Sequence, residues 1–414
     1  MKKYSLKLFP FLLSFLFIFP MLKESLSSFL VILICLNTII YKIAAKDYSL
    51  PKPKTLLLTI PFWVILIRSF FSGNFEINAS HIQHSLFFLL IPIFFPLIPK
   101  RFFSMENLSL YFEILKNACF IIAFGYVIAF LYVYDFSDFF VFKYDIPKFR
   151  DFVYSESPVF KIHPTYYTSI VFFCTAYSFE KVLKKKKYLE LVYVTIFMII
   201  TFMLLAKINI VMMIALLMFM LLFRAGVSVK NKIVSSLFFL VTIIILIVSV
   251  PGIKLRFIEM FKSYNKPPSG VAYDSTNIRV SIYNCCWNIA KENYLVGVGF
   301  ENLQNSLNEC YKSNYDSSFY ESHNYMTHNY YFYLLLSTGV FGLFLYLLYL
   351  ANIIRICFKS NIFIFKIFLL NVLIICFFED YLYRHYGVLF FNLMLMCFIQ
   401  YSKTYETDNL EDAY

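Results

Sequence analysis

Charged side chains are scarce in this chain of 414 residues. Asp, Glu, Lys and Arg make up 15% of it, hydrophobic residues make up 60%, and the mean hydropathy is +0.69. Because roughly a quarter of the residues in soluble globular domains are charged, this composition excludes an ordinary soluble protein. The long apolar runs also lack the alternation of barrel strands, and helices satisfy the backbone in lipid. The sequence therefore predicts an all-α, polytopic membrane protein.

Several motifs that would supply a cofactor are absent as well. The sequence contains no CxxC pair, no zinc spacing of His and Cys, no Walker loop and no GxGxxG. His81 and His84, at positions i and i+3, could in principle bind a metal, but no third ligand lies near them in the sequence. No predicted inner loop could hold a nucleotide-binding domain. We therefore expect no metal and no cofactor, so the substrate must carry the energy for any reaction.

The net charge of +12 could suggest nucleic acid, but the basic residues stand in short clusters between apolar runs. Such clusters are typical of orientation signals in membrane proteins. We expect the lipid bilayer as a partner, and no nucleic acid.

Apolar runs of about 15 to 20 residues predict membrane spans. We count about twelve, with a long polar segment between the ninth and the tenth. No internal repeat relates them. The runs lie near 8–22, 26–42, 55–71, 85–98, 114–134, 165–183, 188–206, 208–223, 233–251, 329–352, 362–379 and 385–401.

The basic residues predict the orientation of these spans. More than half of the 37 Lys and Arg residues fall in short alternate segments, which the positive-inside rule places in the cytoplasm together with both termini. All six histidines then lie on the outer side or at its membrane edge. The predicted organisation is 1–251 with spans one to nine and an outer segment at 135–164, an outer loop at 252–328, spans ten to twelve at 329–401, and a cytoplasmic tail at 402–414.

Most of the nine cysteines lie inside apolar runs, where Cys behaves as a small hydrophobe. Cys285, Cys286 and Cys310 lie in the long polar segment. If it faces an oxidising compartment, Cys285 or Cys286 could pair with Cys310, and three free thiols are an equal alternative.

His328 and Asn329 stand where the polar segment meets an apolar run. A histidine at this boundary could act as a general base, with an interfacial hydrogen bond as the simpler alternative.

Arg279 offers a planar fork suited to phosphate oxygens, although a lone Arg is usually a solvated charge. Lys207 stands between two apolar runs, where an ionisable residue suggests function and snorkelling is the alternative. In a later outer turn, an ion pair between Asp380 and Arg384 is the simplest interpretation.

These residues occur in an order that resembles the O-antigen ligase family, which also includes O-antigen polymerases. The similarity covers about a fifth of the chain, with agreement of topology elsewhere. Two further positions fit loosely: Ala206-Lys207 stands where the family usually has Ser-Arg, and His163-Pro164 resembles an HP-x-Y box. The residues that carry the resemblance are Arg279, Trp287, Gly297 and Gly299 within Tyr-Leu-Val-Gly-Val-Gly-Phe, His328-Asn329, Gly339 and Gly342.

The resemblance implies a bundle similar to the GT-C glycosyltransferases in the bacterial inner membrane. It implies inverting transfer, without metal or ATP, of a glycan from undecaprenyl diphosphate to lipid A-core on the periplasmic face. His328 would then accept the proton of the acceptor hydroxyl, and Arg279 and Lys207 would hold the diphosphate. His323-Asn324 duplicates the His-Asn pair, but the spacing to Gly339 favours His328. The expected substrate-binding residues are Asn329, His163, His323, Trp287, Gly297 and Gly299.

Other functions remain open at this point. A polymerase of O-antigen or capsule would use the same donor with a second lipid-linked repeat as acceptor. A protein glycosylation transferase would use a Ser or Tyr acceptor. A polysaccharide transporter predicts repeat symmetry and charges near mid-bilayer, and the sequence shows neither.

Overall fold

The structure, a computed structural model, describes residues 1–72, 75–143, 146–158, 160–222, 275–315, 320 and 324–411, with isolated positions between 228 and 262. Within this part, the fold is all-α apart from one antiparallel pair of two-residue strands. Five helical segments are long and apolar enough to cross a membrane, which supports the predicted polytopic membrane protein. They are Glu24–Ala44, Pro53–Phe71, Asn78–Leu97, Met105–Val133 and Tyr330–Lys359, with shorter apolar helices at Glu190–Met203, Lys207–Leu222 and Phe363–Ile375.

Each predicted span other than 233–251 overlaps a helix. Most of the span at 233–251, most of the loop at 252–274 and His323 lie outside the described residues. The total of twelve spans stays a prediction.

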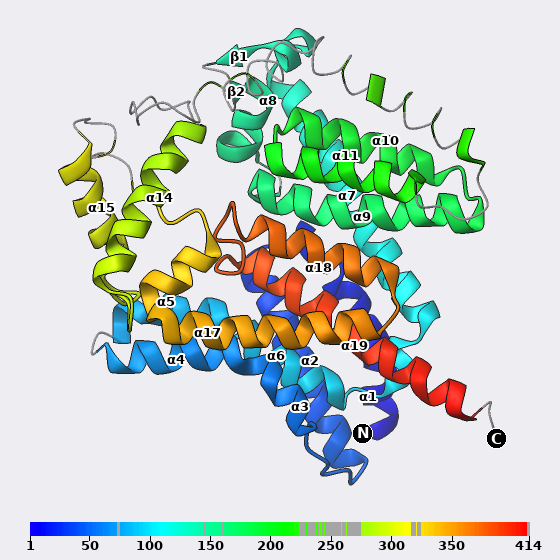
Figure 1. Ribbon diagram of the computed structural model, residues 1–414. Coiled ribbons are helices and arrows are strands. Elements are labelled where there is room, and N and C mark those ends of the chain that lie inside the picture. Colours follow the sequence, from blue (N-terminus) through cyan, green and yellow to red (C-terminus); the bar gives the residue numbers. More distant parts are fainter. Residues whose placement is uncertain are drawn as a thin grey trace. The chain divides into compact units, whose positions relative to one another are not determined.

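The chain divides into two compact units, of which the first comprises Met1–Leu115 and Ser281–Tyr414. Helix α4 packs along α17 in this unit, and α19 packs on α6 (Figure 1). Its elements are α1 (Lys2–Leu16), η1 (Phe19–Met21), α2 (Glu24–Ala44), α3 (Pro53–Leu56), η2 (Leu57–Thr59), α4 (Ile60–Phe71), α5 (Phe75–Ser85), α6 (Phe87–Phe94), η3 (Phe95–Leu97), η4 (Lys100–Phe103), α15 (Leu303–Asn314), α17 (Tyr330–Lys359), α18 (Phe363–Ile375) and α19 (His385–Glu411).

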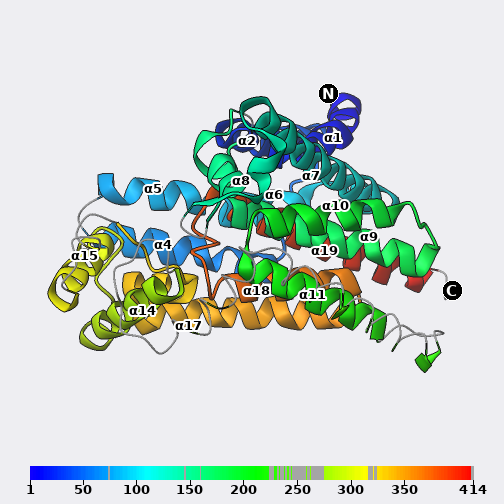
Figure 2. The same ribbon diagram turned by 90° about the horizontal axis from the view of Figure 1, so that it is seen from above.

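The second unit comprises Lys116–Val280. Helices α9, α10 and α11 lie side by side in it (Figure 2). A buried ion pair ties α7 to α10 through Lys116 and Glu190, whose Nζ and Oε2 atoms are 2.9 Å apart. Its elements are η5 (Phe136–Phe140), β1 (Phe142–Lys143), β2 (Ile146–Pro147), α8 (Lys148–Asp151), η6 (Phe152–Glu156), α9 (Pro164–Lys185), α10 (Glu190–Met203) and α11 (Lys207–Leu222), while α7 (Met105–Val133) and α14 (Ser275–Glu292) each have residues in both units.

Helix α17 is two helical arms joined by a sharp reversal at Gly339. The backbone of Gly339 is non-helical, with φ 68° and ψ −171°. The rings of Tyr330 and Tyr346 are 5.4 Å apart, although sixteen residues of straight helix would separate them by about 24 Å. The first arm therefore folds back beside the second, as Figure 1 shows. The expected span at 329–352 does not run as one straight helix from His328.

Candidate functional site

The turn at His328 and Asn329 begins the first arm of α17. The Asn329 Oδ1 atom accepts hydrogen bonds from the amides of Tyr331 (2.9 Å) and Phe332 (3.1 Å), so Asn329 is the N-cap of the helix. His328 has a positive φ of 43°, a conformation that costs a non-glycine residue about 1–3 kcal/mol. Other contacts must hold this strained turn in place.

Asp380, which is buried, supplies those contacts. Its carboxylate accepts hydrogen bonds from the amides of His328 (3.1 Å) and Asn329 (3.2 Å) and from the hydroxyl of Thr327. Burial raises the pKa of Asp380 above its ordinary value, while the His328 charge and these hydrogen bonds act in the opposite direction. The sequence suggested an ion pair with Arg384 for this aspartate and missed its role in the turn. The feature of the sequence that could have indicated this role is an acidic residue in the adjacent outer loop.

Glu379 positions the imidazole of His328. The Glu379 Oε2 atom lies 3.2 Å from the His328 Nδ1 atom, and the His328 side chain keeps 33% of its surface exposed. A carboxylate at Nδ1 favours the tautomer with the proton on that nitrogen. The Nε2 atom is then able to accept a proton from a substrate.

Further hydrogen bonds join the start of α17 to the end of α18. The amide of Tyr330 donates to the carbonyl of Cys376 at 2.8 Å. From α14, the hydroxyl of Tyr283 donates to the carbonyl of Phe377 at 2.9 Å and lies 3.3 Å from the carbonyl oxygen of His328. The end of α18, which precedes Glu379 and Asp380, is thereby held against the His328 turn.

The loop between α14 and α15 interlocks with the break in α17. The amide of Val298 donates to the carbonyl of Leu336 at 2.7 Å, and the amide of Val340 donates to the carbonyl of Tyr294 at 2.8 Å. In a continuous helix the amide of Val340 would donate to Leu336 instead. The loop thus replaces the hydrogen bond that the reversal removes.

Glycine is required on both sides of this contact. A Cβ atom on Gly297 would lie 2.3 Å from the Leu336 carbonyl oxygen, and one on Gly339 would lie 2.0 Å from that of Leu295. Gly297 and Gly339 also have positive φ angles. Gly297 therefore has a structural role in this contact, and its role in substrate binding stays a prediction. Gly299 also has a positive φ and lies beside Glu301.

Arg68 of α4 completes the hydrogen bonding at the break. Its Nε atom donates to the carbonyl of Ser337 at 3.1 Å, a carbonyl near the C-terminal end of the first arm. A cation is favourable at this end of a helix, and an unpaired carbonyl is costly in lipid. The sequence reading did not single out Arg68, although a basic residue inside an apolar run was the available signal.

His81 and His84 do not form a metal site with a third residue in the described part of the chain. The His81 Nδ1 atom lies 2.7 Å from the hydroxyl of Tyr333 on the first arm of α17. His81 therefore helps to fix the first arm from the side of α5.

Three predicted site residues, His163, Lys207 and Arg279, belong to the second unit. His163 is the N-cap of α9, and its Nδ1 atom accepts from the amide of Thr165 at 3.3 Å. Lys207 begins α11 and Arg279 lies half-buried near the start of α14. That these residues act together with His328 stays a prediction.

The turn before Lys207 is held by a residue that the sequence reading missed. The Arg150 Nη1 atom donates to the carbonyls of Leu204 (2.6 Å) and Leu205 (2.8 Å). Leu205 has a positive φ of 44°. Arg150 thereby stabilises the abrupt connection between α10 and Lys207.

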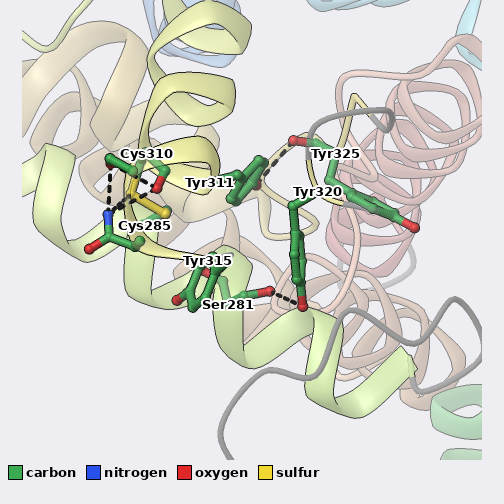
Figure 3. Close-up of a disulfide and its surroundings, with 9 residues drawn as sticks. Ser281, Cys285, Cys310, Tyr311, Tyr315, Tyr320 and Tyr325 are labelled. Carbon is green, nitrogen blue, oxygen red and sulfur yellow. Dashed lines mark hydrogen bonds between the residues drawn. A yellow bond between two sulfur atoms is a disulfide. The ribbon is translucent and has the colours of Figure 1, made fainter. Parts of the chain in front are cut away.

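A disulfide connects α14 and α15 through Cys285 and Cys310, whose Cα atoms are 5.8 Å apart (Figure 3). Cys286 is a free, buried thiol. The structure therefore selects one of the alternatives that the sequence left open. Trp287, on the same helix, is 54% exposed and has the Lys291 ammonium 5.7 Å from its ring centre.

Comparison with known families adds a separate finding. Residues 191–347 match the model of a family described as O-Antigen ligase. No curated protein matches the chain. The match runs from α10 to the second arm of α17, so it includes the His328 turn and the break at Gly339, and it confirms the resemblance seen in the sequence.

Proposed function

We propose, from the premise that residues 191–347 carry an O-antigen ligase domain, that this protein transfers a glycan from undecaprenyl diphosphate to lipid A-core. Members of this family are ligases and polymerases of the glycosyltransferase type, and their substrates are lipid-linked glycans. The observation that carries the proposal is the geometry of His328. Asp380 holds its backbone, Glu379 lies at Nδ1, and Nε2 is left for a substrate hydroxyl.

The reaction would be a single displacement. As the acceptor oxygen forms its bond to the anomeric carbon, its proton moves to His328 Nε2. The bond between that carbon and the diphosphate oxygen breaks, and its electron pair leaves with undecaprenyl diphosphate. Arg279 and Lys207 would stabilise the negative charge that develops on this leaving group. Lys207 offers a point charge rather than the fork of an arginine.

The disulfide supports a periplasmic location for the site. Disulfides persist in oxidising compartments such as the periplasm, and Cys285 and Cys310 lie on the two helices that flank the loop docked on α17. This location also follows from the positive-inside rule, which places both termini in the cytoplasm.

Lipopolysaccharide from a deletion strain tests the reaction. Loss of long chains from lipid A-core, together with accumulated lipid-linked polymer, indicates a ligase. Core that carries single repeat units indicates a polymerase. Unaltered lipopolysaccharide contradicts both.

A His328→Gln variant tests the general base in the complemented strain. We expect at least about a 100-fold loss of transfer at normal membrane abundance, since general-base catalysis contributes 10²–10⁴-fold. Glu379→Gln should lose roughly tenfold because it keeps a hydrogen-bonding group at Nδ1 but removes the charge. His84→Gln, in which the altered histidine takes no part in the proposed chemistry, is the control. Full transfer by His328→Gln would contradict the assignment.

A further inference from the structure

A strip of side-chain amides lies next to the segment that leads into His328. Gln304 and Asn308 are one turn apart on α15, and Asn324 belongs to the irregular segment before the turn. The Gln304 Nε2 atom donates to Asn308 Oδ1 at 2.9 Å, and Asn308 Nδ2 donates to Asn324 Oδ1 at 2.8 Å. The amides are thus aligned head to tail.

The two ends of this strip remain available to a ligand. Within the described residues, neither the Gln304 Oε1 atom nor the Asn324 Nδ2 atom has a protein hydrogen bond, which leaves one acceptor and one donor. Asn324 is exposed, and Gln304 and Asn308 are partly exposed. Because amides carry no charge, the strip suits a neutral ligand with many hydroxyl groups rather than an anion.

The ring of Tyr325 connects the strip to His328. The centres of the two rings are 6.3 Å apart. The carbonyl of Tyr325 accepts hydrogen bonds from the hydroxyl of Tyr311 (3.1 Å) and from Gln304 (3.3 Å), and Figure 3 shows the first of these. Burial raises the pKa of Tyr325 to about 12, so its hydroxyl stays neutral. A partly exposed aromatic ring with a fixed backbone can stack on the apolar face of a sugar.

The helix that presents the amides is firmly anchored. Leu303, Leu307 and Tyr311 are fully buried along one face of α15. The disulfide between Cys285 and Cys310 ties the same helix to α14 (Figure 3). A rigid set of polar groups loses little entropy when it binds a ligand.

We propose that Tyr325, Gln304, Asn308 and Asn324 form a subsite for one neutral sugar of the acceptor glycan. The sugar stacks on Tyr325, its hydroxyls bind the amides, and the reacting hydroxyl of the acceptor reaches His328. This assignment rests on the proposed glycosyl transfer. The subsite belongs to the acceptor because the acceptor hydroxyl must meet His328, whereas the donor is held by cations at its diphosphate.

Kinetics with the purified protein in lipid nanodiscs test this subsite. Lipid A-core from the deletion strain is titrated against a saturating lipid-linked donor. In the double variant Gln304→Ala, Asn324→Ala, we expect acceptor KM to rise about tenfold, since two hydrogen bonds contribute roughly 1.4 kcal/mol or more. The kcat and the donor KM should stay within about twofold.

Tyrosine variants and a matched amide separate binding from general damage. Tyr325→Ala removes the ring and should raise acceptor KM about fivefold, and Tyr325→Phe, which restores the ring, should recover most of that loss. Asn305→Ala removes an exposed amide from the same helix and should change nothing. An unchanged acceptor KM in the double variant, or a rise in donor KM alone, overturns the subsite.

A binding measurement distinguishes failure of the subsite from failure of the proposed function. The probe is deacylated core oligosaccharide from the host's own lipopolysaccharide, followed by saturation-transfer NMR. If the wild type binds it and the double variant does not, the subsite stands even when no glycan is transferred. If both proteins bind it equally, or neither binds it, the subsite is wrong whatever the transfer assay shows.

Discussion

Replacing Gly339 with alanine perturbs the reversal of α17 at a single atom. The added Cβ atom would lie 2.0 Å from the carbonyl oxygen of Leu295 and 2.5 Å from the amide nitrogen of Val296. Both are backbone atoms, so no side-chain rotation can relieve the overlap. The loop must move away from the break, and the two hydrogen bonds that join them, at 2.7 and 2.8 Å, must lengthen.

The cost of this change can be worked from its parts. A non-glycine residue in the backbone region of Gly339 costs about 1–3 kcal/mol, and each buried hydrogen bond that loses its partner costs about 1–3 kcal/mol. We therefore expect Gly339→Ala to destabilise the protein by about 4 kcal/mol, which lowers the melting temperature of a chain of 414 residues by roughly 5 °C. Because the His328 turn begins the first arm, we also expect transfer to fall about 100-fold, as a misplacement of about 1 Å can produce.

The measurement combines thermal unfolding in detergent with transfer in nanodiscs. Gly125→Ala is the control, because Gly125 is inside α7 and its added Cβ would meet only the Phe160 side chain, at 3.0 Å. Alanine favours a helix interior by about 1 kcal/mol over glycine, so the melting temperature of the control should stay within roughly 1–2 °C of the wild type. If Gly339→Ala kept the melting temperature and transfer rate of the wild type, the interlocked reversal would be wrong.

Three other perturbations have definite expected outcomes. Arg68→Met should increase hydrogen exchange around the α17 break because the Ser337 carbonyl loses its donor. Arg68→Lys should restore part of the protection, and equal exchange in both variants would contradict the role of Arg68 as a C-cap. The double variant Cys285→Ser, Cys310→Ser should lose about 3 kcal/mol, as a loop of this length predicts, and reductant should lower the melting temperature of the wild type alone. A raised folded-state pKa makes Asp380 contribute stability at acidic pH that is lost as pH rises above the ordinary aspartate pKa and through the folded-state pKa. The melting temperature of the wild type relative to Asp380→Asn should therefore fall as the pH rises above about 4, and a rise would contradict this linkage.

The reversal also changes where the candidate base lies. The ring of Tyr330 contacts that of Tyr346, which lies seven residues after Gly339 in the second arm. The start of the first arm therefore lies beside a point on the second arm that is about 10 Å from Gly339. A straight helix would have placed His328 at the far end. If the second arm crosses the membrane with Lys359 in the cytoplasm, the proposed site is recessed below the outer end of this span. A recessed site would exclude water from the glycosyl diphosphate.

Properties that depend on composition or on local pattern could be read from the sequence. The scarcity of charge and the length of the apolar runs determined the membrane class, because lipid requires long helices whatever their partners. His328-Asn329 marked the start of a helix, since an N-cap satisfies amides only two or three residues away. Gly297 and Gly339 were visible as parts of a family pattern.

Contacts between distant segments were decided by the tertiary structure. Neighbouring residues on a helix point about 100° apart, so only the packing of α14 on α15 could select Cys285 rather than Cys286. Asp380 and Glu379 reach His328 across about fifty residues, and Arg68 reaches the α17 break across 269. No local rule links such positions, because burial creates the need for a partner and the fold determines which residue supplies it.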